Sequence, residues 1–215
     1  MAVIVPTIMT NSPEKYKALI GTLHPFAKRV QIDICDGQFV PTTTIPEINA
    51  WWPKEWEVDF HMMVVNPKEH LQNILKLKPS LCLFHAETGE NLLPIISELK
   101  AHGIKAGIAL VKHTYPGNVK AMIEASDHVL IFGGEIGKQG SQADLLQAEK
   151  VKLIREIKHT VEIGWDGGAS IQNVRALAQA GIDVINVGSA ISQSKNPEAV
   201  FKALEAETEK WGVRL

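Results

Sequence analysis

The sequence has 215 residues, of which 45% are hydrophobic and 21% are charged, and its formal net charge is -2. These proportions are those of an ordinary globular protein. Lysine and arginine are scattered along the chain, which leaves no basic patch for nucleic acid or an anionic membrane. No stretch approaches the roughly 18 apolar residues of a membrane-spanning helix. We therefore expect a protein that binds a small molecule, with no nucleic-acid partner and no membrane partner.

Two cysteines, Cys35 and Cys82, lie far apart and show neither the spacing of a metal pair nor a disulfide framework. The first ten residues lack the basic and apolar regions of a signal peptide. Both observations favour a reducing compartment, so we expect a cytoplasmic protein.

Short runs rich in β-branched residues recur at intervals of roughly 20 to 30 residues, and segments with helical spacing of apolar residues separate them. This alternation is typical of a parallel sheet. Eight strands are predicted, at Val3–Ile8, Arg29–Cys35, Glu57–Met63, Leu81–His85, Lys105–Leu110, His128–Phe132, Val161–Trp165 and Asp183–Val187.

Helix boundaries are marked by capping residues followed by proline at the start and by glycine at the end. The eight strand–helix units have no linker between them, so they predict a single-domain (β/α)8 TIM barrel over residues 1–215. A doubly wound open sheet, which usually has fewer strands, is the weaker alternative. The marked boundaries are the starts at Ser12-Pro13, Asn66-Pro67, Asn196-Pro197 and Ala169-Ser170, and the ends at Gly103 and Gly181.

Polar residues alternate into the predicted barrel from the second and third strands. With a period of two, Gln31, Asp33 and Cys35 share one face, and Asp59, His61 and Met63 share the corresponding face of the next strand. Asp33 is either a buried carboxylate satisfied by backbone groups or a functional acid. His61 beside it is either a core histidine or a metal or acid/base residue. We interpret His85 as a supporting residue.

Two glycine-containing turns follow the seventh and eighth predicted strands, where barrels of this kind usually bind phosphate. Gly167 and Gly168 allow backbone N–H groups to approach a ligand closely, and Gly188-Ser189 forms a second small-residue turn. Together the two turns predict a phosphate site.

Asp33 and Asp166 come from strands on opposite sides of the predicted barrel mouth. Two carboxylates that face each other across a substrate are able to remove a proton from one face of a carbon and return one to the other face. The resulting enediolate must be stabilised by a metal or by hydrogen-bond donors. Asp33, His61 and Asp166 would supply three metal ligands.

The chain resembles the ribulose-phosphate 3-epimerase family over nearly its whole length. The combination of an Asp-Gly-x-Phe-Val-Pro run with downstream His-Met-Met and Asp-Gly-Gly motifs carries this resemblance. The similar segments are Pro6-Thr7-Ile8, residues 32–41, residues 59–63, residues 84–87, Asp166-Gly167-Gly168 and residues 188–191.

The resemblance implies a (β/α)8 fold and interconversion of ribulose 5-phosphate with xylulose 5-phosphate. It also implies a divalent metal (zinc, iron or manganese). We further expect a homo-oligomer. Asp33 and Asp166 would be both acid/base residues and metal ligands, His61 a ligand that also faces substrate, and Thr7 a substrate contact. Cys35 and Met63 would line the pocket wall.

Three positions depart from the family pattern. Gln31 replaces the first histidine ligand of the metal, and a neutral carboxamide is a weaker ligand than imidazole. Residues 136–142 replace the flexible loop over the substrate, with Gly137 and Gly140 retained as phosphate contacts and Lys138 either a new contact or simply solvated. Gly164 replaces an acidic residue of the family.

These departures keep alternatives open. The chain is either a sugar-phosphate epimerase, for ribulose 5-phosphate or another ketose phosphate, or a non-catalytic sugar-phosphate binder that lost activity with the change at Gln31. A metal-independent lyase or decarboxylase lacks a suitable inward lysine. Trp51, Trp52 and Trp56 either pack a partner subunit or cover the barrel.

Overall fold

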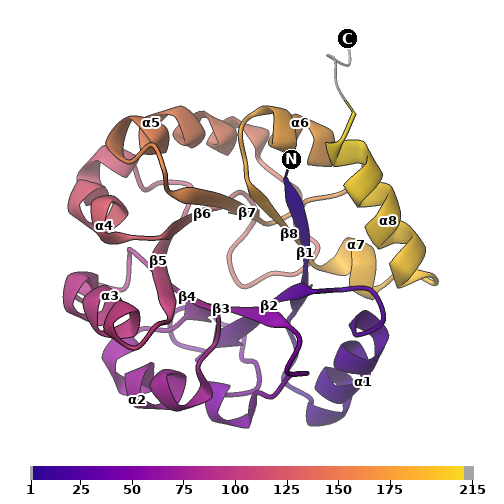
Figure 1. The fold of residues 1–215 in the computed structure, drawn as a ribbon, viewed down its shortest axis with the longest axis horizontal. Helices are drawn as coiled ribbons and strands as arrows, with labels where there is room; N and C mark the ends of the chain where they lie inside the picture. The colour runs from indigo at the N-terminus through magenta and orange to yellow at the C-terminus, as the bar shows by residue number, and fades with distance from the viewer. Residues whose placement is uncertain (1, 211–215) are drawn as a thin grey trace.

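In the computed structural model, which describes residues 2–210, eight parallel strands close into a barrel in the order of the sequence. Helices surround the barrel on the outside (Figure 1). The predicted (β/α)8 fold is therefore confirmed. Residue 1 and residues 211–215, which the prediction included in the domain, lie outside the described residues. Within residues 2–210, no helix is both long enough and apolar enough to cross a membrane.

Six strands have the predicted bounds: β1 Val3–Ile8, β2 Arg29–Cys35, β3 Glu57–Met63, β4 Leu81–His85, β5 Lys105–Leu110 and β6 His128–Phe132. The seventh is shifted by one residue, to β7 Glu162–Asp166, and the eighth begins one residue later than predicted, at β8 Val184–Val187. Val161 still belongs to the turn before β7, where its N–H donates to the Lys158 carbonyl, and Asp166 extends β7 by pairing with Phe132. The shift matters because it makes Asp166 a strand residue with a fixed direction.

An α-helix follows each strand except β2, after which only a short 3-10 helix precedes β3, and two helices follow β8. Ser12 and Asn196 cap their helices through their side chains, whereas Asn66 makes no side-chain cap bond although a helix begins at Pro67. The helix expected at Ala169-Ser170 begins later, at Val174, because residues 171–173 form a turn. The helices are α1 Pro13–Leu23, α2 Pro67–Leu77, α3 Leu92–Ala101, α4 Lys120–Ala125, α5 Lys150–Ile157, α6 Val174–Gln179, α7 Ser189–Ser192 and α8 Pro197–Thr208, with short 3-10 turns η1 Glu47–Asn49, η2 Pro116–Val119 and η3 Leu145–Glu149.

Both predicted glycine caps have positive φ, 77° at Gly103 and 92° at Gly181. This conformation is the left-handed one that ends a helix and that glycine adopts without strain. Each glycine turns the chain from a helix back to the next strand, as the sequence indicated.

The main hydrophobic core lies between the outer face of the barrel and the helices. Part of the tryptophan cluster belongs to it: Trp56 is buried, and Trp52 packs edge-on against Phe60 of β3 with ring centroids 5.5 Å apart. Trp51 remains 48% exposed, with its carbonyl accepting a hydrogen bond from Tyr16. Two of the three tryptophans therefore cover the barrel.

The barrel interior is mixed in polarity. A small apolar cluster is formed by Leu81, Leu83, Ala109 and Leu130. At the N-terminal ends of the strands, Arg29 donates to Asp59 at 2.8 Å and to both oxygens of Glu162 at 2.8 and 3.1 Å, and His128 lies 2.7 Å from Glu162. Although burial acts to raise it, the pKa of Glu162 is held below its usual range by these hydrogen bonds.

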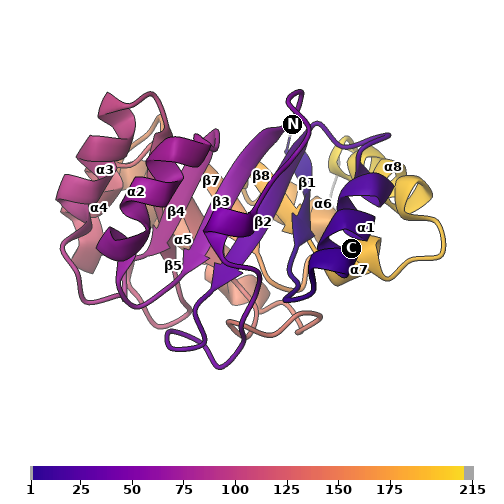
Figure 2. The same cartoon turned by 90° about the horizontal axis from the view of Figure 1, so that it is seen from below.

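The opposite, C-terminal end of the barrel carries the long connections. In the side view of Figure 2 the loops after β2 and β6 lie together beyond this end. Thr42 of the first loop donates a hydrogen bond to the Gly137 carbonyl of the second. These contacts close the barrel mouth over the strand ends.

Gly164 on β7 gives room to the His128 ring, which leads to a first prediction. A Cβ at position 164 would lie 2.3 Å from His128 Nε2 and 2.8 Å from Leu130 Cδ1, so Gly164→Ala requires the interior to shift. We expect it to lower the free energy of unfolding by about 1–3 kcal/mol in urea denaturation. Gly21→Ala is the matched control, because that exposed glycine of α1 has open space around it and should gain about 0.5–1 kcal/mol. Equal gains in both variants would contradict the observed packing.

Candidate active site

Two carboxylates and one carboxamide meet at the C-terminal end of the barrel. Gln31 of β2 donates through Nε2 to Asp33 Oδ1 at 2.9 Å and to Asp166 Oδ2 at 2.6 Å. Gln31 is fully buried and Asp33 is 6% exposed. The alternation of β2 places both side chains inside the barrel, and the extension of β7 to Asp166 brings the second carboxylate to them.

Burial and, to a smaller extent, the negative charge of Asp33 together raise the pKa of Asp166 to about 7. The charge of His61 and the hydrogen bonds from Gln31 and the Gly167 N–H act in the opposite direction. A carboxyl group with this pKa is partly protonated at neutral pH. The pair is thus able to hold one proton between two carboxylates, as an acid next to a base.

His61 of β3 lies beside both carboxylates. Its Nδ1 is 3.0 Å from Asp33 Oδ1 and 3.6 Å from Asp166 Oδ2, and its ring is fully buried. Burial acts to lower the pKa of His61, but the contacts with Asp33 and Asp166 raise it overall. The other nitrogen, Nε2, lies 2.8 Å from Nε2 of His85, so the prediction of His85 as a supporting residue agrees with its position.

These side chains fit a divalent metal. One ligand atom from each of Asp33, His61 and Asp166 lies within 4.8 Å of the others. Two carboxylate oxygens and an imidazole suit zinc, iron or manganese. Gln31 has its Nε2 turned towards the carboxylates, while its buried Oε1 has no hydrogen-bond partner. Rotation of the amide would turn Oε1 towards the carboxylates, an arrangement that is favourable only with a cation between them.

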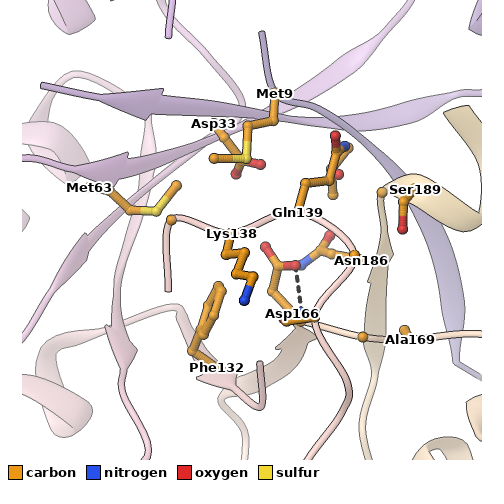
Figure 3. Close-up of a pocket in the computed structure, with 17 residues that line it drawn as sticks. Met9, Asp33, Met63, Phe132, Lys138, Gln139, Asp166, Ala169, Asn186 and Ser189 are labelled. Atoms are coloured by element: carbon orange, nitrogen blue, oxygen red, sulfur yellow. Dashed lines mark hydrogen bonds between the residues drawn. The ribbon is translucent and has the colours of Figure 1, made fainter. Parts of the chain in front are cut away.

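A cavity opens above the two carboxylates (Figure 3). Its wall includes ten of the residues predicted from the sequence, whereas Gln31, His61 and Cys35 lie behind the lining. Cys35 is buried, with its Sγ 3.9 Å from Met63 Sδ, so Met63 faces the cavity and Cys35 supports it. The predicted residues in the lining are Thr7, Asp33, Met63, Gly137, Gly140, Asp166, Gly167, Gly168, Gly188 and Ser189.

The predicted glycine turns crowd against the rest of the cavity wall. Gly167 and Gly168 have φ of 99° and 72°, and a Cβ on Gly168 would lie 2.3 Å from the Ala143 backbone nitrogen. A Cβ on Gly188 would lie 2.8 Å from Thr7 Oγ1 and 3.3 Å from Gln139 Nε2. The glycines therefore leave backbone at the cavity surface where a side chain would fill the space.

The loop after β6 forms the outer wall of the cavity. Lys138 makes an ion pair with Glu135 at 2.8 Å and its side chain is 68% exposed. Lys138 also lines the cavity, so its role as a phosphate contact stays a prediction. Ser141 accepts a hydrogen bond from the Glu135 N–H at 3.0 Å, which folds the loop back on itself.

Several lining residues were not predicted. Asn186 is the most informative: it is 2% exposed, it lines the cavity, and its Oδ1 has no hydrogen-bond partner. Alternation along β8 puts Asn186 on the same face as Gly188, so the period of two would have found it. The others carry weaker signals, because they are apolar or lie in loops: Met9, Phe132, Gln139, Ser141 and Ala169.

The structure combines a closed (β/α)8 barrel with a cavity at the C-terminal ends of its strands, which is the usual place of the active site in barrel enzymes. The family model described as "Ribulose-phosphate 3 epimerase family" matches residues 3–192. This chain belongs to that family, and it is an isomerase of the class of carbohydrate epimerases.

Named relatives agree with this assignment. The chain is 30% identical to ribulose-phosphate 3-epimerase of Schizosaccharomyces pombe, over 98% of each chain. It is 31% identical to the cytoplasmic isoform of Oryza sativa, over 84% of this chain and 82% of the relative. Among solved structures, 3-hexulose-6-phosphate synthase from Salmonella typhimurium superposes with a TM-score of 0.72 at 15% identity, covering 95% of this chain and 97% of the other, and shares the fold.

The carboxamide at position 31 leads to a prediction about metal affinity. Gln31→His should tighten zinc binding by about tenfold or more, because an imidazole is a stronger ligand than an amide that donates to both carboxylates. Competition titration with a zinc chelator measures the affinity. Gln38→His, which adds a histidine at an exposed turn residue, is the control and should leave the tight site unchanged. Equal affinity of parent and Gln31→His would show that position 31 does not contact the metal.

Proposed function

We propose that this enzyme interconverts D-ribulose 5-phosphate and D-xylulose 5-phosphate by inverting the carbon next to the carbonyl group. The family membership supports the reaction class and the substrate. The observation that carries the mechanism is the pair of buried Asp33 and partly buried Asp166, joined through the Gln31 amide at the floor of the cavity. Both carboxylates line the cavity, so both are accessible to one bound substrate.

The pair works as one acid and one base. The ionised carboxylate takes the C3 proton from one face of the ketose, and the electron pair of the C–H bond moves into an enediolate. The protonated carboxyl then donates its proton to the opposite face of C3, which inverts the centre. The exchange leaves the pair with one proton in total, so the reverse reaction runs with the roles exchanged. In the metal-free protein, burial and the charge of Asp33 raise the pKa of Asp166, which favours one proton shared by the pair.

Stabilisation of the enediolate comes from the same cluster. A divalent metal held by Asp33, His61 and Asp166 would act as a Lewis acid on the substrate oxygens. The buried Gln31 amide orients both carboxylates from below, and the His61 imidazole lies beside them. Met63 and Phe132 bound the cavity with apolar surface, which limits the access of water to the reacting carbon.

Backbone amides at the far side of the cavity would bind the phosphate. Gly167 and Gly168 follow β7, and Gly188 and Ser189 follow β8, so the two turns are neighbours at the mouth. Thr7 of β1 and Gly140 of the β6 loop lie against the Gly188–Ser189 turn. The phosphate would thus be fixed on the side of β7, β8 and β1, with the carbonyl end of the sugar over the carboxylates. Cytoplasmic location and assembly into a homo-oligomer stay predictions.

Hydrogen exchange tests the two-base mechanism directly. In D₂O the parent, supplied with Zn²⁺, Mn²⁺ or Fe²⁺, should incorporate deuterium at C3 of ribulose 5-phosphate, as followed by NMR. Asp33→Asn and Asp166→Asn should each lower the rate by about 10²-fold or more, because each removes one acid/base group. Glu57→Gln, an exposed carboxylate at the other end of β3, should exchange like the parent.

The outcomes also separate the rival function. Absence of exchange with any pentulose or hexulose phosphate, at all three metals, would overturn the epimerase proposal. If the sugar phosphate still binds in that case, the chain is the non-catalytic binder. The observation that favours this function is the Gln31 amide, which already donates hydrogen bonds to both carboxylates.

Replacement of Gly188 tests the phosphate site. Gly188→Val should raise KM for the sugar phosphate by about tenfold or more, because the new side chain would collide with Thr7 and Gln139 inside the cavity. This is the size of effect expected from the loss of one charge-assisted hydrogen bond. The effect on kcat should be smaller, since the carboxylates lie elsewhere in the cavity. Gly21→Ala serves as the folding control. An unchanged KM would place the phosphate site in another part of the cavity.

A further inference from the structure

The nitrogen of His61 that faces away from the carboxylates is the start of a chain of hydrogen bonds. Nε2 of His61 lies 2.8 Å from Nε2 of His85, at the end of β4. Nδ1 of His85 lies 3.3 Å from Oε2 of Glu87, in the loop that follows. Both imidazoles are fully buried, while Glu87 is partly exposed at the end of the chain. Neither Glu87 nor His85 lines the cavity, so their role is exerted through His61.

Glu87 determines where His85 carries its hydrogen. Oε1 of Glu87 accepts the Val111 N–H at 3.1 Å and the Thr114 hydroxyl, which leaves Oε2 for His85. An ionised carboxylate only accepts hydrogen bonds. Nδ1 of His85 must therefore be the donor in this contact.

His85 in turn determines where His61 carries its hydrogen. The ring of His85 is buried between Phe39 and Phe132, with ring centroids 4.9 and 6.3 Å away, and a charged ring there would face His61 without solvent. A neutral His85 with its hydrogen on Nδ1 has a lone pair on Nε2. The 2.8 Å contact between the two Nε2 atoms holds one hydrogen, so it belongs to His61.

We propose that Glu87 and His85 form a positioning relay that keeps the hydrogen of His61 on Nε2 and turns the Nδ1 lone pair towards Asp33 and Asp166, as a metal ligand. This inference rests on the metal site of the proposed function. Without the relay, neutral His61 would be free to carry its hydrogen on Nδ1 and donate it to Asp33, 3.0 Å away, which blocks coordination. A proton bound at Nδ1 in the metal-free protein is displaced by the metal.

Glu87→Gln is a sharp test because an amide has only one acceptor oxygen. If that oxygen faces Val111 and Thr114, the NH₂ group donates to His85 Nδ1. His85 then carries its hydrogen on Nε2, and the other imidazole of the relay carries its hydrogen on Nδ1. If it faces His85, the Val111 N–H loses its acceptor. The side chain keeps its size in either case, so the change is confined to hydrogen bonding and charge.

Zinc affinity of the 215-residue chain is the first readout, measured by chelator competition without substrate. Glu87→Gln should weaken binding by about 10–100-fold, the usual effect of a lost partner behind a histidine ligand. Thr114→Val is the matched control, because it removes the hydroxyl bond to Oε1 and leaves Oε2 with His85. It should stay within about threefold of the parent. Thermal unfolding of all variants checks that they are folded.

The second readout is the hydrogen position on His85, from two-dimensional ¹H–¹⁵N spectra of the zinc-loaded protein labelled at histidine. The His85 signal, assigned by its loss in His85→Gln, should show the hydrogen on Nδ1 in the parent and in Thr114→Val, and on Nε2 in Glu87→Gln. If Glu87→Gln fails to fold, His85→Phe and His85→Gln replace it. Phenylalanine has no acceptor and should weaken zinc binding about tenfold or more, whereas the glutamine oxygen still accepts from His61 and should restore part of the affinity.

Three outcomes would overturn the relay. These are zinc affinity within threefold of the parent in a folded Glu87→Gln whose His85 carries its hydrogen on Nε2, equal affinities of His85→Phe and His85→Gln, or a hydrogen on Nε2 of His85 in the parent. A parent that binds no zinc overturns the relay together with the metal site of the proposed function. A parent that binds zinc through the relay but shows no deuterium exchange contradicts only the epimerase activity.

Discussion

The site depends on one constraint, that two carboxylates are held together in a buried place. Like charges at this separation repel, and burial removes the water that would otherwise solvate them. The protein offsets this cost with the Gln31 amide between them, the His61 imidazole beside them and the Gly167 N–H, which donates to Asp166 at 2.7 Å. Burial and the charge of Asp33 raise the pKa of Asp166, so the constraint that destabilises the fold also favours a proton on this carboxyl group.

The fold stays stable despite the unfavourable free energy of the carboxylate pair, because the main hydrophobic core lies elsewhere. The large apolar cluster lies between strands and helices, while the interior holds only four residues in its separate apolar cluster. Below that cluster, Arg29 and His128 hold Asp59 and Glu162 in a second polar group. Charged residues inside the barrel are therefore each matched by a partner, and the outer core supplies the burial of apolar surface that keeps the sheet closed.

Sequence patterns predicted most of the fold and the centre of the site, for a physical reason in each case. Alternation along β2 and β3 fixed the inward direction of Asp33 and His61, and helix caps such as Ser12 marked boundaries. Alternation could not show that Gln31 reaches across to Asp166, because contacts between distant strands depend on closure of the barrel. The hydrogen-bond chain through His85 to Glu87 was hidden for the same reason, and Lys138 was ambiguous because a loop charge has no period.

Gln31 and Gly164, two departures from the pattern that the resemblance implies, lie at different depths of the barrel. Gln31 lies at the mouth, where its amide donates to Asp33 and Asp166. Gly164 lies deeper, where a Cβ would be 2.3 Å from Nε2 of the His128 ring. An amide carries no charge, so Gln31 offers the two carboxylates hydrogen bonds without a compensating positive charge. Burial and the charge of Asp33 therefore keep the pKa of Asp166 raised in spite of these hydrogen bonds.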